Sequence, residues 1–154
     1  MPREYCISWD ELHRNTRALA KQLLAEGREY HGIVGIARGG LIPATLLARE
    51  MGIRLIDTLC IASYEHTAQG EASVLKGMPG EDGNGWLLVD DLVDTGNTAN
   101  IARALLPKAY FVAIYAKPQG KPLADAFVKE VDQDLWLHFP WDTDGTAYIK
   151  PLAE

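Results

Sequence analysis

Apolar residues are grouped along this chain in short runs that end at turn-forming residues. Such runs occupy Gly32–Ala37, 55–63, 86–89 and Tyr110–Ala116. Short apolar runs between turn signals are typical of β-strands, and of buried ones in particular. The pattern therefore predicts four strands, and a further short strand is expected at 135–139, just before a turn at 140–142.

The segments between these runs carry the signals of helices. Ser8 and Glu11 form a capping box, and apolar residues at helical spacing continue from it to about Gly27. Pro43 suits the first turn of a second helix, which is expected to end at Gly52. Strands that alternate with helices indicate a parallel sheet with right-handed crossovers.

The remaining segments complete the predicted architecture. A third helix is expected to begin after Thr95 and to end at Pro107. Residues 65–85 are polar and rich in glycine, which predicts a long mobile loop or a loose hairpin of the kind that is often functional. Because the chain shows no internal repeat and no linker, residues 1–154 are expected to form a single domain.

Composition narrows the possible functions. The chain has 154 residues, of which 47% are hydrophobic, and this suffices for one domain with a sizeable core. The net charge of −6 argues against general nucleic-acid binding, which normally needs a basic face. There is no signal peptide and no apolar run of about 18 residues, so we expect an intracellular protein without a membrane span.

The most informative stretch is 86–99, in which an apolar run stops at two adjacent carboxylates, Asp90 and Asp91. The carboxyl end of a strand in an open α/β sheet is where ligands bind. Residues 95–98 then open a helix, and free backbone N–H groups at a helix start bind anions. Carboxylates suited to a sugar diol or a metal ion, next to a phosphate-binding turn, fit a phosphorylated ribose.

Two alternatives fit this stretch less well. A strand followed by an acidic turn and a capped helix would have a similar pattern, but a fold gains nothing from placing Asp90 and Asp91 side by side. A phosphatase of the haloacid dehalogenase type would need two aspartates separated by one residue. Asp90, Asp91 and Asp94 do not provide that spacing.

Three further positions carry candidate ligand-binding side chains. Arg38 can bind pyrophosphate oxygens and Gly39 lets the backbone approach a phosphate, although a tight turn with a surface arginine would have the same sequence. Lys117 ends an apolar strand, and its alternative is a lysine that extends from the strand into solvent. Trp136 could stack on a flat base or simply pack in the core.

The stretch 86–99 resembles the motif with which type I phosphoribosyltransferases bind 5-phosphoribosyl pyrophosphate (PRPP). Other segments resemble the bacterial xanthine–guanine phosphoribosyltransferase family, namely residues 36–41, 63–64, 74–76, 116–118 and 140–142. The resemblance extends from Tyr5 to Pro151. It implies an α/β fold of the type I phosphoribosyltransferases, with a twisted, mainly parallel sheet flanked by helices. A mobile lid would lie at about 65–85, and a small hood would be built from the N-terminal segment and residues of about 118–154.

That family transfers the 5-phosphoribosyl group from PRPP to N9 of guanine, xanthine or, less well, hypoxanthine. The products are GMP, XMP or IMP and pyrophosphate. The resemblance therefore implies a Mg²⁺-dependent purine salvage enzyme that takes PRPP and oxo-purine bases and forms a homotetramer. It also implies a cytoplasmic location, with at most a peripheral association with the inner face of the membrane.

The resemblance assigns roles to individual residues. The PRPP-binding residues are Arg38, Gly39, Asp90, Asp91, Leu92, Val93, Asp94, Thr95, Gly96, Asn97 and Thr98. Asp90 and Asp91 hold the ribose hydroxyls and Mg²⁺, with Asp91 as the metal ligand. Asp94 is the catalytic acid/base group near N7 of the purine. Lys117 donates to the 6-oxo group, while Trp136 and Leu137 stack on the base and read its C2 substituent.

The sequence departs from the family at two positions. Asn97 stands where the family usually has a second glycine, and because Asn tolerates a left-handed backbone we expect the turn to keep its shape. Gly70 stands where the family commonly has a basic residue in the lid, and this leaves Lys76 as a nearby cation.

Two other functions stay open on the sequence alone. A PRPP-responsive regulator could share the fold, but it should carry a nucleic-acid-binding domain or a basic face, for which this chain has neither the length nor the charge. A phosphoribosyltransferase for a different base is the second alternative.

Overall fold

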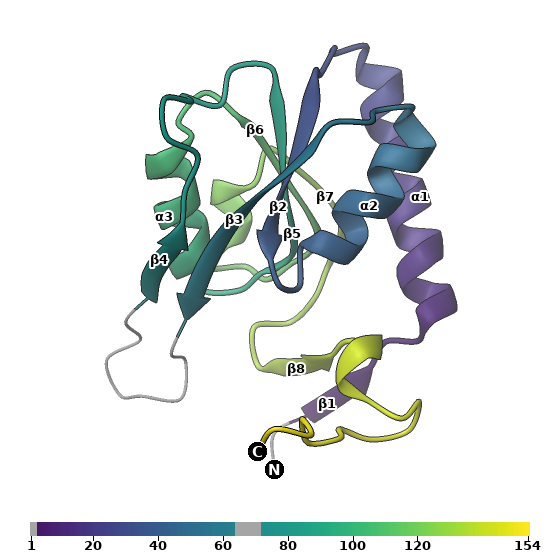
Figure 1. Ribbon diagram of the computed structural model, residues 1–154. Helices are drawn as coiled ribbons and strands as arrows, with labels where there is room; N and C mark the ends of the chain where they lie inside the picture. Colours follow the sequence, from purple (N-terminus) through teal and green to yellow (C-terminus); the bar gives the residue numbers. More distant parts are fainter. Residues whose placement is uncertain (1–2, 64–71) are drawn as a thin grey trace.

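The computed structural model describes residues 3–63 and 72–154 of the chain. Within them a six-stranded sheet has the order β4-β3-β2-β5-β6-β7, and a separate two-stranded sheet pairs β1 with β8 (Figure 1). The elements are β1 (Arg3–Cys6), α1 (Trp9–Glu26), β2 (Gly32–Ala37), α2 (Leu41–Met51), β3 (Ile56–Ser63), β4 (Ala72–Lys76), β5 (Trp86–Val93), α3 (Asn97–Leu105), β6 (Tyr110–Ala116), the 3₁₀ turn η1 (Lys121–Leu123), β7 (Ala126–Glu130), β8 (Leu135–His138) and the 3₁₀ turn η2 (Pro140–Asp142). All neighbours in the large sheet are parallel except β3 and β4, so the predicted mainly parallel α/β sheet is confirmed.

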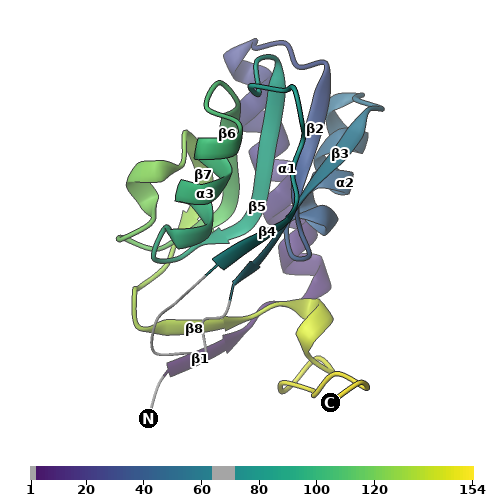
Figure 2. The same cartoon turned by 60° about the vertical axis from the view of Figure 1, so that its left-hand side comes forward.

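Helices cover both faces of the large sheet. Figures 1 and 2 show α1 and α2 together on one face and α3 on the other. Leu87 and Val89 of β5 pack in the cluster that contains the α1 and α2 side chains, whereas Leu88 packs in the cluster under α3. Successive residues of β5 are thus buried on opposite faces, which is why an uninterrupted apolar run marks this strand.

The helix ends follow the sequence signals. The Ser8 hydroxyl accepts a hydrogen bond from the Glu11 N–H at 3.0 Å, and α1 ends at Gly27, whose φ is 74°. The Glu11 carboxylate does not complete the capping box but accepts from the Tyr5 hydroxyl, 2.5 Å away. α2 ends at Gly52 as predicted. No helix in the described part of the chain is long and apolar enough to cross a membrane.

Three strands go beyond the sequence prediction: β1, β4 and β7. β4 lies inside the segment 65–85, for which a loop or loose hairpin is expected, and it pairs with β3 in antiparallel fashion. Residues 64–71 lie outside the described part, so the mobility of a lid there stays a prediction. Lys76, the cation expected near the lid, is held on β4 by the Asp57 carboxylate at 2.9 Å and the Thr58 carbonyl at 2.8 Å.

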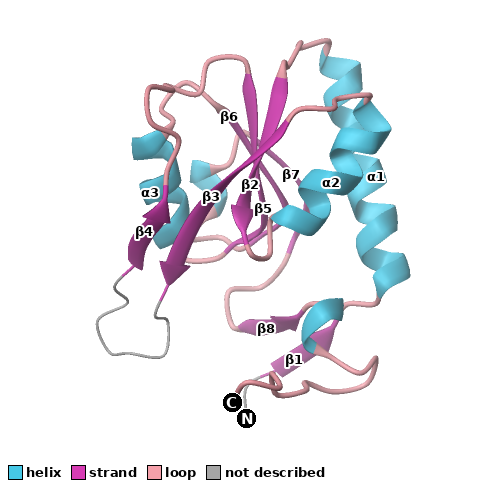
Figure 3. Cartoon of the chain, in the orientation of Figure 1, coloured by secondary structure: helices cyan, strands magenta, loops and turns pink. Residues whose placement is uncertain are grey.

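The hood is the small parallel sheet of β1 and β8, which lies apart from the large sheet beside both chain termini (Figure 3). The C-terminal part of this sheet is β8 alone, so the hood contains fewer residues than the predicted segment of about 118–154. β7 falls within that segment but pairs with β6 in the large sheet, because Ala126 and Phe127 are aligned with Val112 and Ala113.

Candidate active site

The strand order reverses between β2 and β5. From β2 the chain crosses to β3 on one side, and from β5 it crosses to β6 on the other, which makes this pair the topological switch point where α/β sheets bind ligands. The pairing of β2 with β5 stops at Gly35 and Val89, while β5 continues beside β6 as far as Val93. Asp90 and Asp91 therefore lie within β5 and not at its end, in the stretch where it has parted from β2.

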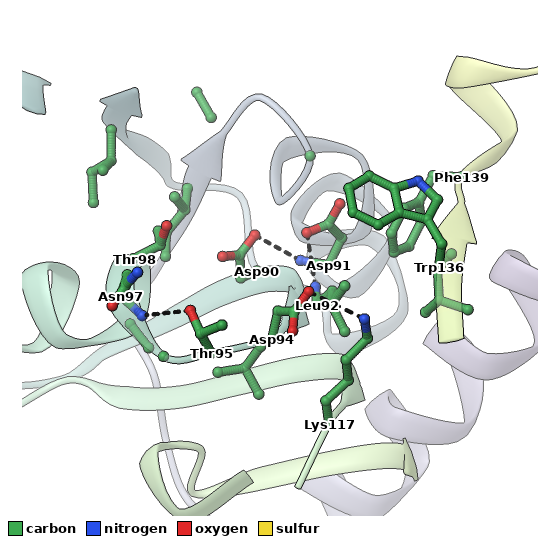
Figure 4. A pocket seen from close by; sticks show the side chains of 18 residues that line it. Asp90, Asp91, Leu92, Asp94, Thr95, Asn97, Thr98, Lys117, Trp136 and Phe139 are labelled. Carbon is green, nitrogen blue, oxygen red and sulfur yellow. Dashed lines mark hydrogen bonds and ion pairs between the residues drawn. The ribbon is translucent and has the colours of Figure 1, made fainter. Parts of the chain in front are cut away.

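A cavity of about 260 Å³ opens at this point. All the predicted site residues except Arg38 line it. Figure 4 shows the helix-start residues Thr95, Asn97 and Thr98 at one end, Lys117 and Trp136 at the other, and Asp90 and Asp91 between them. The cavity thus has the order of parts that a phosphate, a sugar and a base would require.

The two adjacent carboxylates are held by backbone N–H groups. The Asp91 N–H donates to Asp90 Oδ1 at 2.9 Å, and the Leu92 N–H donates to Asp91 Oδ1 at 2.7 Å. Burial raises the pKa of Asp91 above the ordinary value of a carboxyl, and the nearby charge of Asp142 acts in the same direction. A cation bound at Asp91 would offset this cost. Gly39 packs directly against it, since a Cβ at this position would overlap the Asp91 carboxylate.

The turn at 95–98 leads into α3. Gly96 has a φ of 99°, and α3 begins at Asn97, whose N–H lies 3.5 Å from the Thr95 hydroxyl. Every described residue with a positive φ is a glycine. Asn97 therefore does not use the left-handed backbone that Asn tolerates, because the positive φ of this turn falls at Gly96. Asn97 replaces a glycine at a position where any residue can begin the helix.

Lys117 and Asp94 meet at the other end of the cavity. Lys117 is only 3% exposed, and its Nζ donates to Asp94 Oδ2 at 3.2 Å. Gln133 Nε2 donates to the other oxygen, Asp94 Oδ1, at 2.8 Å. The alternative of a lysine that extends into solvent is therefore wrong. The sequence does not reveal Gln133, because in the run Asp132-Gln133-Asp134 it has the pattern of an exposed turn.

β8 supplies an aromatic side chain to the same end. Trp136 is 46% exposed and lines the cavity, so the alternative that it packs in the core is wrong. Leu137 and Phe139 are buried and also line the cavity. Phe139 is not among the predicted site residues, although the alternation of strand residues places it on the same face as Leu137.

Arg38 is the predicted residue that lies apart. It follows a cis peptide bond with Ala37, its side chain is exposed, and it does not line the cavity. The pKa of Asp142 in η2 is raised above its ordinary value by burial, and the positive charge of Arg38 opposes part of this rise. The Arg38 side chain is thus outside the cavity lining, while the backbone at Gly39 borders the cavity.

Comparison with known proteins identifies the class to which this fold and site belong. The family described as "Phosphoribosyl transferase domain" matches residues 8–146, and the chain belongs to this family. The xanthine-guanine phosphoribosyltransferase of Chromohalobacter salexigens is 57% identical over 152 residues, which cover 99% of this chain and 91% of that protein. The protein of the same name from Desulfotalea psychrophila is also 57% identical, over 97% of this chain and 92% of its own length.

Solved structures agree on the fold. A purine phosphoribosyltransferase from Pyrococcus horikoshii superposes with a TM-score of 0.75 at 24% identity, covering 96% of this chain and 99% of that one. The xanthine-guanine-hypoxanthine phosphoribosyltransferase of Helicobacter pylori has a TM-score of 0.76 at 23% identity, covering 92% and 96%. The type I phosphoribosyltransferase fold implied by the sequence is confirmed.

Proposed function

We propose that the cavity binds PRPP and an oxo-purine base and transfers the phosphoribosyl group to N9 of the base. The chain is 57% identical to two xanthine-guanine phosphoribosyltransferases over nearly its whole length. This identity shows that it is an enzyme of that kind, which acts in purine salvage. The observation that supports the site assignment is the contact between Lys117 and Asp94, which places a hydrogen-bond donor next to an acceptor.

The purine edge formed by the 6-oxo group and N7–H is complementary to this pair. Lys117 can only donate, so it suits the 6-oxo oxygen, and the Asp94 carboxylate accepts from N7–H. Adenine carries an amino group at position 6, which would face Lys117 donor to donor. Each buried group left without a partner costs about 1–3 kcal/mol, so the site favours oxo-purines.

Trp136 and Leu137 complete the proposed base site. The half-exposed Trp136 ring offers a flat surface at the cavity for stacking. Backbone carbonyls near Leu137 can accept from the 2-amino group of guanine, whereas the 2-oxo group of xanthine would need a bridging water. We therefore rank guanine at or above xanthine as a substrate.

PRPP would occupy the rest of the cavity. The turn at 95–98 offers its backbone N–H groups to the 5′-phosphate, Asp90 and Asp91 face the ribose hydroxyls, and the segment at Arg38 and Gly39 borders the pyrophosphate. The exposed Arg38 side chain would have to turn into the cavity to bind a pyrophosphate oxygen.

Mg²⁺ fits this donor set. No three His, Cys, Asp or Glu side chains group as a metal site within residues 3–63 and 72–154. Mg²⁺ commonly binds through one or two carboxylates together with substrate phosphates and water, and Asp91 beside PRPP supplies such a set. When bound, the ion supplies positive charge against the leaving pyrophosphate.

The chain itself needs no nucleophile for this reaction. The bond between C1 of the ribose and the pyrophosphate oxygen breaks while the bond between C1 and N9 forms. The electron pair leaves with the pyrophosphate, and the N7 proton passes to Asp94, which acts as the general base. Backbone N–H groups, and Arg38 once its side chain has turned into the cavity, would stabilise charge that develops on the leaving group.

A substrate panel tests the proposal. PRPP is supplied with guanine, xanthine, hypoxanthine, adenine, uracil or orotate, with Mg²⁺ or with excess EDTA, and nucleotide formation is followed. We expect turnover of the three oxo-purines only, and only with Mg²⁺. Turnover of a pyrimidine base in preference to guanine would contradict the assignment.

Assembly and location belong to the same proposal. We propose a homotetramer in the cytoplasm, with at most peripheral association with the membrane. Exposed aromatic side chains on β1 and α1, Tyr5 at 46% and Trp9 at 55%, are compatible with a surface that another subunit covers. Sedimentation equilibrium measures the assembly, and a monomer would contradict it.

A further inference from the structure

The side chain of Gln133 bridges the backbone at Gln119 and the carboxylate of Asp94, which lines the purine end of the cavity. Its Oε1 accepts from the Gln119 backbone N–H at 2.9 Å, and its Nε2 donates to Asp94 Oδ1 at 2.8 Å. A backbone N–H can only donate, so the oxygen of the amide must face Gln119. The amide therefore has one possible orientation, and it can only donate to Asp94.

The loop that carries Gln133 is fixed on both sides. The Val131 N–H donates to the Ala116 carbonyl at 2.9 Å, next to Lys117. Arg3 of β1 contacts the carboxylates of both neighbours of Gln133, at 3.0 Å for Asp132 and 2.5 Å for Asp134. Gln133 lies between these two residues and is half-buried, and its amide contacts Asp94.

The two oxygens of Asp94 are thereby made unequal. Oδ1 is occupied by a neutral amide that belongs to the protein scaffold. Oδ2 faces Lys117, a partner that the 6-oxo group of a purine can take over. A carboxylate whose Oδ1 is held by a donor can receive the N7 proton on Oδ2 without turning.

We propose that Gln133 is a positioning residue, which holds Oδ1 of Asp94 as an acceptor so that Oδ2 alone is presented to the purine. This inference rests on the proposed role of Asp94 as the acid/base group. Gln133 has no contact with substrate in this scheme and acts through Asp94. Its loss should therefore lower kcat and leave PRPP binding unchanged.

Two variants separate this role from simple packing. Gln133→Glu keeps an oxygen for the Gln119 N–H but replaces the donor with a second carboxylate opposite Asp94. Gln133→Met keeps the length of the side chain and removes both hydrogen bonds. Gln22→Met, at an exposed position of α1 outside the cavity lining, makes the same change and serves as the control.

The measurements are kcat and KM for guanine, the Kd for a non-hydrolysable PRPP analogue with Mg²⁺, and Tm. We expect both Gln133 variants to lower kcat by about 10- to 100-fold, the loss expected for a hydrogen bond to a charged group. Gln133→Glu should lower kcat at least as much as Gln133→Met does. The Kd should stay at the wild-type value, and the control should match the wild type throughout.

The same substitutions in an Asp94→Asn background complete the test. If Gln133 acts through Asp94, Gln133→Met should lower kcat by less than about twofold in that background, because the effects of substituting residues that act as a unit do not add. A wild-type kcat in Gln133→Glu, or equal losses in both backgrounds, would overturn the positioning role alone. An unchanged kcat in Asp94→Asn would overturn the role proposed for Asp94 and the positioning role with it.

Discussion

Lys117 Nζ lies 3.2 Å from Asp94 Oδ2, with the lysine 3% exposed. The two residues come from the ends of neighbouring strands, β5 and β6, which stay paired as far as Val93 and Ala116. A buried lysine needs an opposite charge nearby, and Asp94 provides it. The contact is at once a structural ion pair and a donor–acceptor pair suited to an oxo-purine.

The first prediction concerns Lys117. Lys117→Met keeps an unbranched apolar stem but removes the donor, so the 6-oxo group loses its partner. The kcat/KM for guanine should fall by about 10- to 100-fold, and the preference for guanine over adenine should narrow. Steady-state kinetics with guanine and adenine measure both kcat/KM and the preference. Lys21→Met, on the exposed face of α1, is the control. An unchanged preference would show that Lys117 does not read position 6.

The second prediction concerns Asp94. Asp94→Asn preserves the shape of the side chain but removes its ability to take a proton. General base assistance is typically worth about 10²–10⁴-fold, and kcat should fall by a factor in that range. The Kd for PRPP should change little, and Asp10→Asn at an exposed position of α1 should match the wild type. If single-turnover rates were equal in Asp94→Asn and wild type, Asp94 would have no role in the chemical step.

The third prediction concerns Asp91 and the metal. Asp91→Ala removes the carboxylate proposed to bind Mg²⁺, so activity should be lost at every Mg²⁺ concentration. Excess EDTA should abolish wild-type activity, and added Mg²⁺ should restore it. The fold should survive, because Asp91 lies beside the cavity and outside both core clusters, and far-ultraviolet circular dichroism checks this. Full turnover in EDTA would contradict the role of a metal.

The fourth prediction uses Gly39. A Cβ at this position would overlap the Asp91 carboxylate, so Gly39→Ala must displace Asp91. Misplacement of a catalytic group by about 1 Å can cost on the order of 10²-fold, and a loss of that size is expected in kcat/KM for PRPP. Gly77→Ala is the matched control, since a Cβ there meets no atom within 4 Å. Equal activity in the two variants would show that the close approach of Gly39 to Asp91 does not matter.

The sequence predicts the parts of the molecule whose signals are local. Ser8, Gly27 and Gly52 mark helix ends through their own backbone chemistry, and the apolar runs of β2 and β6 are buried on both faces. The stretch 86–99 concentrates the carboxylates and the anion-binding turn in one segment. These features need no knowledge of distant residues.

The features that the sequence does not reveal depend on pairing between distant segments. β1 has the polar sequence Arg3-Glu4-Tyr5-Cys6, and it forms a strand only because β8 runs alongside it. β7 is a strand because Ala126 and Phe127 meet β6. The role of Gln133 depends on a contact with Asp94 across 39 positions of the chain, and no pattern around Gln133 signals it.

A crystal structure with guanine, Mg²⁺ and a non-reactive PRPP analogue tests the central claim most directly. We predict Lys117 Nζ within about 3 Å of the 6-oxo oxygen and Asp94 Oδ2 within the same distance of N7, with the Trp136 ring stacked on the base. A purine bound with its 6-oxo and N7 edge turned away from Lys117 and Asp94 would contradict the proposed base site.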